Sequence, residues 1–438
     1  MLLIIRNMLK SIIEKFKKGE NAKNSLIALV LKMSGVGLLF LLTLFLTNNF
    51  DANLVGQYSF SRSILLILGG ISILGAEQSI IYYAGYLKSK NALNNLKSIY
   101  LKTITLIIYS SLSLIIIAYL INEDFINSFF EVNNPYGLIK KVVLYLFSHS
   151  VMMLNIEVFR SLNKIILSEF FRNIMRYALF FVCAYLLLIQ NLEHYLVDVY
   201  LICFGILAFI TSILVYLEFR KLGEIDKKLQ IRTKEIFYTS YPMALNAMTF
   251  FLMQSTDVIL LGKFETYNVV AYYDTAVRIA SLTLMGVMSV NVVVAPKIAE
   301  IYSKKDMEGI SQLFKSSIKL MLILSTPAVL FLFFFSNFVL GLFGEDYKSA
   351  STALLILVGA QYLTTFMGIA GTYMNMTGKQ RILHKILLFA FFLNVILNYV
   401  FIPIWGMAGS ALATGITIVA WHSIAIGIIY KKDKIAIF

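Results

Sequence analysis

The hydrophobic positions of this chain fall into long runs separated by short polar segments, and the pattern continues from about residue 25 to residue 430. The runs are about 20 residues long, the length at which an α-helix crosses a hydrocarbon layer. They predict twelve transmembrane helices. Their approximate limits are Ser25–Leu46, Tyr58–Leu87, Ile104–Ile121, Val142–Phe159, Ile165–Gln190, Tyr195–Leu217, Phe237–Leu261, Val269–Val294, Ile318–Leu342, Ser351–Met374, Ile382–Ile402 and Gly409–Tyr430. We therefore expect an all-α membrane protein.

The composition agrees with a body that lies within a membrane. Of 438 residues, 59% are hydrophobic and 14% are charged, and the mean hydropathy is +0.79. Soluble proteins have roughly 45–50% apolar and 25% charged residues. The sequence contains no phosphate-binding glycine loop, paired-histidine metal motif or nucleophile elbow, which excludes a self-contained ATP-driven pump. Cys183 and Cys203 both fall within predicted spans, so we expect no disulfide framework and no metal site.

The placement of charge predicts an orientation. The chain has 38 Lys and Arg against 24 Asp and Glu, and this net charge of +14 would suggest a nucleic-acid partner in a soluble protein. If the N-terminus is cytoplasmic, 29 of the 38 basic residues lie in cytoplasmic segments. The outside loops carry Lys263 and Lys348, and the Lys140/Lys141 pair is the exception. The positive-inside rule then predicts that both termini are cytoplasmic. We read the charge as a topology signal and expect no nucleic-acid partner.

The order of the runs predicts four segments. Residues 1–23 form an amphipathic basic stretch that we expect to lie on the inner leaflet, and no cleavable signal peptide is expected. Residues 24–218 and 237–438 would each form a six-helix bundle, joined by a cytoplasmic linker at 219–236. Phe50-Asp51 followed by Arg62 resembles Phe264-Glu265 followed by Arg278, which favours a parallel repeat. A transport path would then lie at the interface of the repeats.

Five basic side chains lie four or more residues inside the ends of predicted spans, where an ionisable group is costly and usually faces a cavity or a partner. We select Lys32, Arg62, Arg172, Arg176 and Arg278 as candidate substrate-binding residues. Lys32 could instead extend to the inner headgroups, and Arg62 could anchor the chain at the outer interface. Arg172 and Arg176 share a helical face with Glu169, so a Glu169–Arg172 ion pair is the structural alternative.

Acidic and amide side chains accompany these cations. Glu77, Asp257 and Asp274 are candidates for positioning the cations or for coupling to an ion gradient, and Asn246, Gln254, Asn394 and Asn398 are candidate polar residues of a cavity. A structural Asp257–Arg278 bridge and ordinary hydrogen bonds between helices are the alternatives. We expect no cofactor, and coupling to a proton or sodium gradient stays open. An arginine-lined cavity suits an anionic substrate, especially phosphate, because guanidinium presents a planar fork of donors.

Several motifs of the C-terminal half resemble a known family. They are Ser240-Tyr241-Pro242, the run from Asp257 to Gly262, Ala271-Tyr272-Tyr273 with Arg278, Phe343 to Tyr347, Asn375 to Lys379, and Leu393 to Tyr399. In order and spacing they resemble the bacterial polysaccharide repeat-unit flippases of the O-antigen type, within the multidrug/oligosaccharidyl-lipid/polysaccharide exporter superfamily. The N-terminal half shares the topology and Gly56-Gln57-Tyr58.

The resemblance implies a function. Such a protein is not an enzyme. It would be a multi-pass protein of the bacterial plasma (inner) membrane that moves an undecaprenyl-diphosphate-linked oligosaccharide to the outer leaflet by alternating access. This step serves O-antigen, lipopolysaccharide or capsule synthesis, and polymerase and glycosyltransferases would be partners besides membrane lipids. A cation-coupled multidrug antiporter of the same superfamily is the first alternative, and a structural scaffold for a glycan synthase is the second.

Overall fold

A computed structural model describes residues 20–223 and 231–435 of the chain, without the side chains of residues 20–26, 29, 242–243, 245–247, 250 and 292. The predicted surface segment 1–23 lies outside this part of the chain, except for residues 20–23 at the start of the first helix. Over the described ranges the chain is helical and contains no strand. The prediction of an all-α protein is confirmed for these residues.

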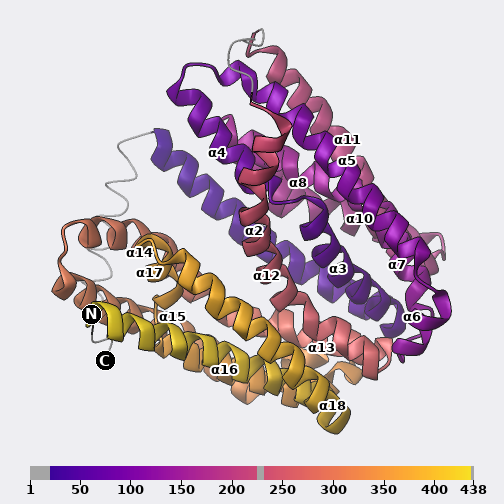
Figure 1. The fold of residues 1–438 in the computed structure, drawn as a ribbon. Coiled ribbons are helices and arrows are strands. Elements are labelled where there is room, and N and C mark those ends of the chain that lie inside the picture. Colours follow the sequence, from indigo (N-terminus) through magenta and orange to yellow (C-terminus); the bar gives the residue numbers. More distant parts are fainter. Residues whose placement is uncertain (1–19, 224–230, 436–438) are drawn as a thin grey trace. The chain divides into compact units, whose positions relative to one another are not determined.

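The helices follow one another with short connections (Figure 1). They are α2 (Glu20–Asn49), α3 (Ala52–Ser72), α4 (Ala76–Ser89), α5 (Leu96–Leu120), α6 (Glu123–Phe129), α7 (Pro135–Leu144), α8 (Leu146–Ser161), α9 (Ile165–Phe170), the π-helical turn η2 (Phe171–Met175), α10 (Arg176–Ile189), α11 (Leu196–Arg220), α12 (Thr233–Phe264), α13 (Tyr267–Ser281), α14 (Met285–Ser303), α15 (Met307–Gly341), α16 (Ser351–Phe366), α17 (Ala370–Met376) and α18 (Gln380–Asp433). The 3₁₀ turns are η1 (Leu93–Asn95), η3 (Glu193–Tyr195), η4 (Leu282–Leu284) and η5 (Glu345–Ala350).

Nine helical stretches of the described residues are long and apolar enough to cross a membrane, or ten if the bent pair α7 and α8 counts as one span. This supports a multi-pass membrane protein, while the number twelve stays a prediction. The 54 residues of α18 contain two predicted spans. Gly406 breaks α18 with φ 52° and ψ −128°. Hydrogen bonds from Asn394 to Thr414 and from Ser410 to Asn398 join the two stretches, so the chain turns back there.

Two predicted spans are interrupted by residues with positive φ. The span Tyr58–Leu87 is divided between α3 and α4, because Leu74 and Gly75 have φ values of 52° and 70°. The span Ser351–Met374 is divided between α16 and α17, where Gly368 has φ 65°. A positive φ interrupts a right-handed helix, and glycine adopts it without steric cost. Both runs are apolar throughout the break, so hydropathy alone gives no sign of it.

The chain divides into two compact units, which are described separately. Unit 1 comprises the described residues of 1–46, 68–120 and 139–245. Its central helix is α8, which packs against α4, α5 and α11 (Figure 1). The polar residues of α8 face these neighbours: Asn155 accepts from Tyr100 at 2.8 Å and donates to Thr211 at 3.0 Å. Polar residues such as Asn155 occur within the predicted span Val142–Phe159 because α8 is mostly buried among its neighbouring helices.

Unit 2 comprises residues 47–67, 121–138 and the described residues of 246–438. In it, α16 packs against α13, α15 and α18. A buried core of α14, α15, α17 and α18 includes Ile298, Phe314, Tyr373 and Met374. The predicted bundles 24–218 and 237–438 follow the sequence halves and stay a prediction.

Candidate functional site

Asp274 on α13 is the centre of a charged cluster within unit 2. Its side chain is 3% exposed. Oδ1 accepts a hydrogen bond from Arg62 at 2.6 Å, and Oδ2 accepts from Nη2 and Nε of Arg278 at 2.9 and 3.0 Å. Ser59 also donates to Oδ2, at 2.8 Å. One carboxylate thus binds two guanidinium groups, and the three side chains together keep one positive charge.

Helical spacing positions these groups. Ser59 and Arg62 lie three residues apart on α3, and Asp274 and Arg278 lie four apart on α13, so each pair lies on one helical face. The guanidinium of Arg278 also lies 5.7 Å from the ring centre of Tyr58. The two arginines related by the sequence echo therefore meet at one carboxylate. The structure pairs Arg278 with Asp274 in place of the Asp257 partner considered from the sequence.

Asp257 on α12 lies in a second polar cluster of unit 2. It is 6% exposed. Its Oδ1 accepts from Asn398 at 3.0 Å, and its Oδ2 accepts from Tyr273 at 3.1 Å and from the hydroxyl of Thr414. Asn394 is 3% exposed and donates to Thr414 at 3.3 Å. These contacts combine α12, α13 and both stretches of α18 around one carboxylate.

This second cluster has a spare acceptor and lacks a cation. Within the described part of the chain, no Lys, Arg or His forms an ion pair with Asp257, and the buried Oδ1 of Asn394 has no hydrogen-bond partner. Burying an unpaired carboxylate costs several kcal/mol. Carboxylate, amide and hydroxyl oxygens are suitable ligands for a hard cation. The arrangement can therefore hold either a proton on Asp257 or a small cation beside it.

A third charged cluster lies within unit 1, where α8 meets α9 and η2. Arg160 pairs with Glu169 at 2.5 Å and approaches Glu157 at 3.6 Å, while Arg172 pairs with Glu157. Asn173 donates to Glu169 at 2.8 Å. The Glu169–Arg172 pair considered from the sequence is replaced by pairs with α8. The π-helical turn that contains Arg172 shifts the helical register, and such turns are frequent at functional sites.

Two further candidates are near this cluster or in the same unit. Glu77 on α4 is half-buried and interacts electrostatically with Glu157 and Arg172. Arg176 donates to the hydroxyl of Tyr177, and its guanidinium lies 4.6 Å from that ring centre. Of the two arginines predicted to share a helical face, Arg172 is thus paired with a carboxylate and Arg176 is stacked on an aromatic ring.

The remaining candidates are less closely connected. Lys32 is exposed on α2, which fits the alternative that it extends to the headgroups. Gln254 is exposed on α12. The side chain of Asn246 lies outside the described residues. The structure therefore brings the sequence-selected residues together in three groups. These are Arg62 with Asp274 and Arg278, Asp257 with Asn394 and Asn398, and Arg172 with Glu77. The role of each group in binding or coupling stays a prediction.

Several residues of these clusters were not selected from the sequence. Ser410 and Thr414 lie four apart in the last predicted span and contact Asn398 and Asp257, at 2.8 Å in the case of Ser410. Arg160 directly follows the predicted span Val142–Phe159 and is one of the 29 basic residues counted as cytoplasmic. Hydroxyl residues at helical spacing were a usable signal for the first two, but Arg160 carried no signal beyond its charge. Among the described residues, no group of three or more His, Cys, Asp or Glu could hold a metal ion.

Residues 242–400 match the MatE family. A probable low-salt glycan biosynthesis flippase, Agl15 of Haloferax volcanii, is 28% identical over 162 residues, which cover 37% of this chain and 34% of the relative. The chain spans about a third of the length of the curated relatives it matches.

Solved structures extend the likeness to nearly the whole chain. The lipid II flippase MurJ in an inward closed conformation superposes with a TM-score of 0.73 and 15% identity, over 93% of this chain and 88% of MurJ. An inward-facing multidrug resistance MATE transporter gives 0.71 and 13%, over 93% and 99%. The chain has the fold of MurJ and the MATE transporters. In this chain, the three clusters described above lie on helices of that fold.

Proposed function

We propose that this chain is a flippase for a lipid-linked oligosaccharide. It would bind an undecaprenyl-diphosphate-linked repeat unit at the inner leaflet and release it at the outer leaflet, by alternating access of two six-helix bundles. The MATE/MurJ fold and the partial identity to a glycan flippase support a transporter rather than an enzyme. The finer assignment to O-antigen, lipopolysaccharide or capsule synthesis rests on the motifs of the C-terminal half.

The observation that carries the proposal is the pairing of two arginines with one buried carboxylate in unit 2. Arg62 and Arg278 share the single charge of Asp274, and Arg278 is 11% exposed. A diphosphate is a multivalent anion, and a guanidinium can bind two of its oxygens at once. We infer that the substrate phosphates exchange with Asp274 as partners of these arginines. Arg176, Arg172 and Lys32 would hold the remaining phosphate or acidic sugar groups.

Coupling to an ion gradient is the second part of the proposal. Asp257 is surrounded by neutral donors and by the spare oxygen of Asn394. We propose that it takes up sodium or a proton as the transporter changes conformation, with Glu77 as a second candidate. The polar residues Asn246 and Gln254 would line the path. Membrane lipids, a polysaccharide polymerase and glycosyltransferases are the proposed partners, in a bacterial inner membrane.

The experiment uses the full chain in liposomes with a fluorescent undecaprenyl-diphosphate oligosaccharide. Outer-leaflet label is reduced chemically, so the rate of loss of the protected fraction measures flipping. We expect the wild type to accelerate flipping, and we expect Arg278→Ala and Arg176→Ala to lower the rate by an order of magnitude or more at equal incorporation, because about 1.4 kcal/mol of lost binding is tenfold. Lys348→Ala, which removes a half-exposed cation of a predicted outside loop that pairs with Glu345, is the matched control.

A cation-coupled multidrug antiporter is the second candidate. The buried carboxylate Asp257 favours it, because such a group can exchange a cation or proton without any anionic substrate. The two arginines at Asp274 keep one positive charge, which argues against typically cationic drugs as substrates. Drug-resistance profiling of a deletion strain separates the two. Altered drug sensitivity with normal surface glycan would refute the flippase assignment.

A further inference from the structure

The hydroxyl of Tyr347, in the turn η5, is buried near the charged cluster of unit 2 without a hydrogen-bond partner. The residue is 3% exposed, and its Oη forms no hydrogen bond with any described residue. Buried hydroxyls are nearly always hydrogen-bonded in folded proteins, so an unpartnered one indicates a bound water or a ligand. Tyr347 also ends the Phe343–Tyr347 motif, to which the proposed function gives no role.

Local structure directs the Tyr347 ring toward α13, the helix that bears Asp274 and Arg278. The turn η5 packs against α13 and α15. Within it, the amide of Tyr347 donates to the carbonyl of Gly344 at 3.2 Å, and Gly344 has φ 130°, which favours glycine. The Tyr347 ring meets Tyr272 of α13 edge to face, with ring centres 4.8 Å apart at 72°. A glycine turn and an aromatic contact thus position the ring.

The hydroxyl end of Tyr347 belongs electrostatically to the charged cluster. It interacts with Arg278 and Asp274, and also with Asp51. Arg62 and Arg278 together carry two positive charges against the one negative charge of Asp274. A phenol hydroxyl donates one hydrogen bond and is uncharged at neutral pH. The cluster therefore combines two guanidinium groups with one neutral donor that has no partner among the described residues.

We propose that Tyr347 is a third phosphate ligand, whose hydroxyl donates to an oxygen of the diphosphate that Arg62 and Arg278 bind. This inference rests on the proposed function and deepens it by adding a residue to its phosphate site. A phosphate oxygen suits this position better than a neutral sugar hydroxyl, because the adjacent side chains keep one positive charge. A hydroxyl that donates to an ionised oxygen forms a charge-assisted hydrogen bond, which is stronger than one between neutral groups.

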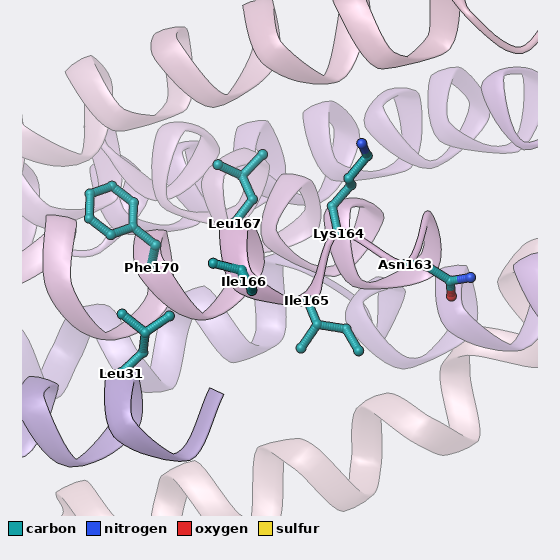
Figure 2. A pocket seen from close by; sticks show the side chains of 7 residues that line it. All are labelled: Leu31, Asn163, Lys164, Ile165, Ile166, Leu167 and Phe170. Atoms are coloured by element: carbon teal, nitrogen blue, oxygen red, sulfur yellow. The ribbon is translucent and has the colours of Figure 1, made fainter. Parts of the chain in front are cut away.

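The unpartnered hydroxyl distinguishes this site from an apolar groove of about 420 Å³ between α2 and α9 in unit 1. Leu31, Ile166 and Phe170 line that groove, and Figure 2 shows the amino group of Lys164 pointing away from Leu31. None of the groove's lining residues has a buried side-chain nitrogen or oxygen that lacks a partner within the described part of the chain. No polar group of the groove therefore specifies a ligand, whereas the hydroxyl of Tyr347 calls for one.

Tyr267, the first residue of α13, is a matched control in the same unit. It is 1% exposed, and its hydroxyl is likewise buried without a hydrogen-bond partner among the described residues. Its ring packs against Phe60, with ring centres 5.7 Å apart. In the described structure, no charged group interacts with its hydroxyl. The two tyrosines share their burial and the lack of a partner, but only Tyr347 interacts with the arginine cluster.

The test compares wild type, Tyr347→Phe and Tyr267→Phe as full chains in mixed micelles, with undecaprenyl diphosphate as the probe. A ligand of the folded state raises the unfolding temperature by an amount that depends on its dissociation constant. We expect Tyr347→Phe to weaken binding of the probe about tenfold, or about 1.4 kcal/mol, and Tyr267→Phe to leave it unchanged. Without the probe, neither variant should unfold below the wild-type temperature, because the removed hydroxyl has no partner in the protein.

Three further lipids identify the group that the hydroxyl contacts. Undecaprenol lacks phosphate, phosphatidylglycerol carries a phosphodiester, and the undecaprenyl-diphosphate oligosaccharide adds the sugars. We expect Tyr347→Phe to leave the binding of undecaprenol and phosphatidylglycerol unchanged and to weaken both diphosphates equally. Equal weakening for phosphatidylglycerol would overturn the assignment to a diphosphate. Weakening for the oligosaccharide lipid alone would assign the hydroxyl to a sugar and overturn the inference.

The outcomes also separate this inference from the proposed function. In liposomes, flipping should fall about tenfold with Tyr347→Phe and stay at the wild-type rate with Tyr267→Phe. Unchanged binding and flipping in Tyr347→Phe would overturn the inference, and the proposed function would stand without it. A lower unfolding temperature of Tyr347→Phe without the probe would reveal a structural partner of the hydroxyl and would also overturn it. A wild type that neither binds the probe nor flips would overturn both.

Discussion

The Arg62–Asp274 pair allows a quantitative test of the charged cluster in unit 2. Removing one partner of a fully buried ion pair costs about 3–5 kcal/mol, whereas an exposed pair contributes about 0–1 kcal/mol. The side chain of Arg62 is 26% exposed and that of Asp274 is 3% exposed. We therefore expect Arg62→Ala to lower the free energy of unfolding by about 2 kcal/mol, between the two limits. Asp274→Asn should cost more, about 3 kcal/mol, because it leaves two guanidinium groups without a counter-charge.

A double-mutant cycle isolates the pair. If the contact is direct, the double variant loses less than the sum of the single variants, with a coupling energy of about 1–2 kcal/mol. Unfolding in mixed micelles can be followed by tryptophan fluorescence, because both tryptophans, Trp405 and Trp421, lie on α18 of unit 2.

The exposed ion pair Lys141–Asp198 is the matched control for this cycle. Its oxygen to nitrogen distance is 2.7 Å, close to that of the test pair, but its side chains are 45% and 28% exposed. Its coupling energy should be at most about 0.5 kcal/mol. Additive effects of Arg62→Ala and Asp274→Asn, or a coupling no larger than that of the control, would refute the assignment of Asp274 as the shared partner.

Three further predictions concern packing, coupling and binding. Gly56→Ala should strongly destabilise the protein in a thermal unfolding assay, because a Cβ at Gly56 would lie 1.8 Å from the carbonyl oxygen of Tyr267. Gly37→Ala is the control and should be neutral or slightly stabilising, because a Cβ there would have no atom within 4 Å. Equal effects of the two substitutions would contradict the packing at Gly56. Asp257→Asn keeps the size of the side chain but removes its charge, so flipping should no longer depend on an imposed sodium or pH gradient. A flipping rate that still depends on the gradient would exclude Asp257 as the coupling group. Arg172→Lys should weaken binding of the diphosphate probe several-fold without loss of folding, because Lys lacks the planar fork, and unchanged binding would contradict that role.

The apolar runs predicted most helices but could not predict where they break. A run of about 20 apolar residues predicts a segment that crosses the lipid, but its hydropathy does not depend on the φ value of any one residue. Gly75 and Gly368 interrupt predicted spans for this reason, whereas Gly406 lies in the gap predicted between Ile402 and Gly409. The presence of glycine was visible in the sequence. Its backbone conformation depends on the neighbouring helices, such as the carbonyl of Ser240 that lies 2.5 Å from a Cβ built at Gly75.

The candidate site was predictable where its contacts follow helical spacing. Asp274 and Arg278 lie four residues apart, a spacing that permits their pairing, although Asp257 was the partner considered for Arg278 from the sequence. The contact of Arg62 with Asp274 joins residues 212 positions apart, and nothing in one sequence specifies it. The same holds for Thr414 at Asp257. The polar residues within spans were thus identifiable, but their partners were determined by the fold.

Flipping of a fluorescent undecaprenyl-diphosphate oligosaccharide by the full chain in liposomes tests the central claim most directly. The flippase assignment predicts faster transbilayer movement with the wild type than with empty liposomes, and a large loss with Arg278→Ala at equal incorporation. A wild-type rate equal to that of protein-free liposomes, measured with an imposed sodium or proton gradient in either direction, would contradict the assignment.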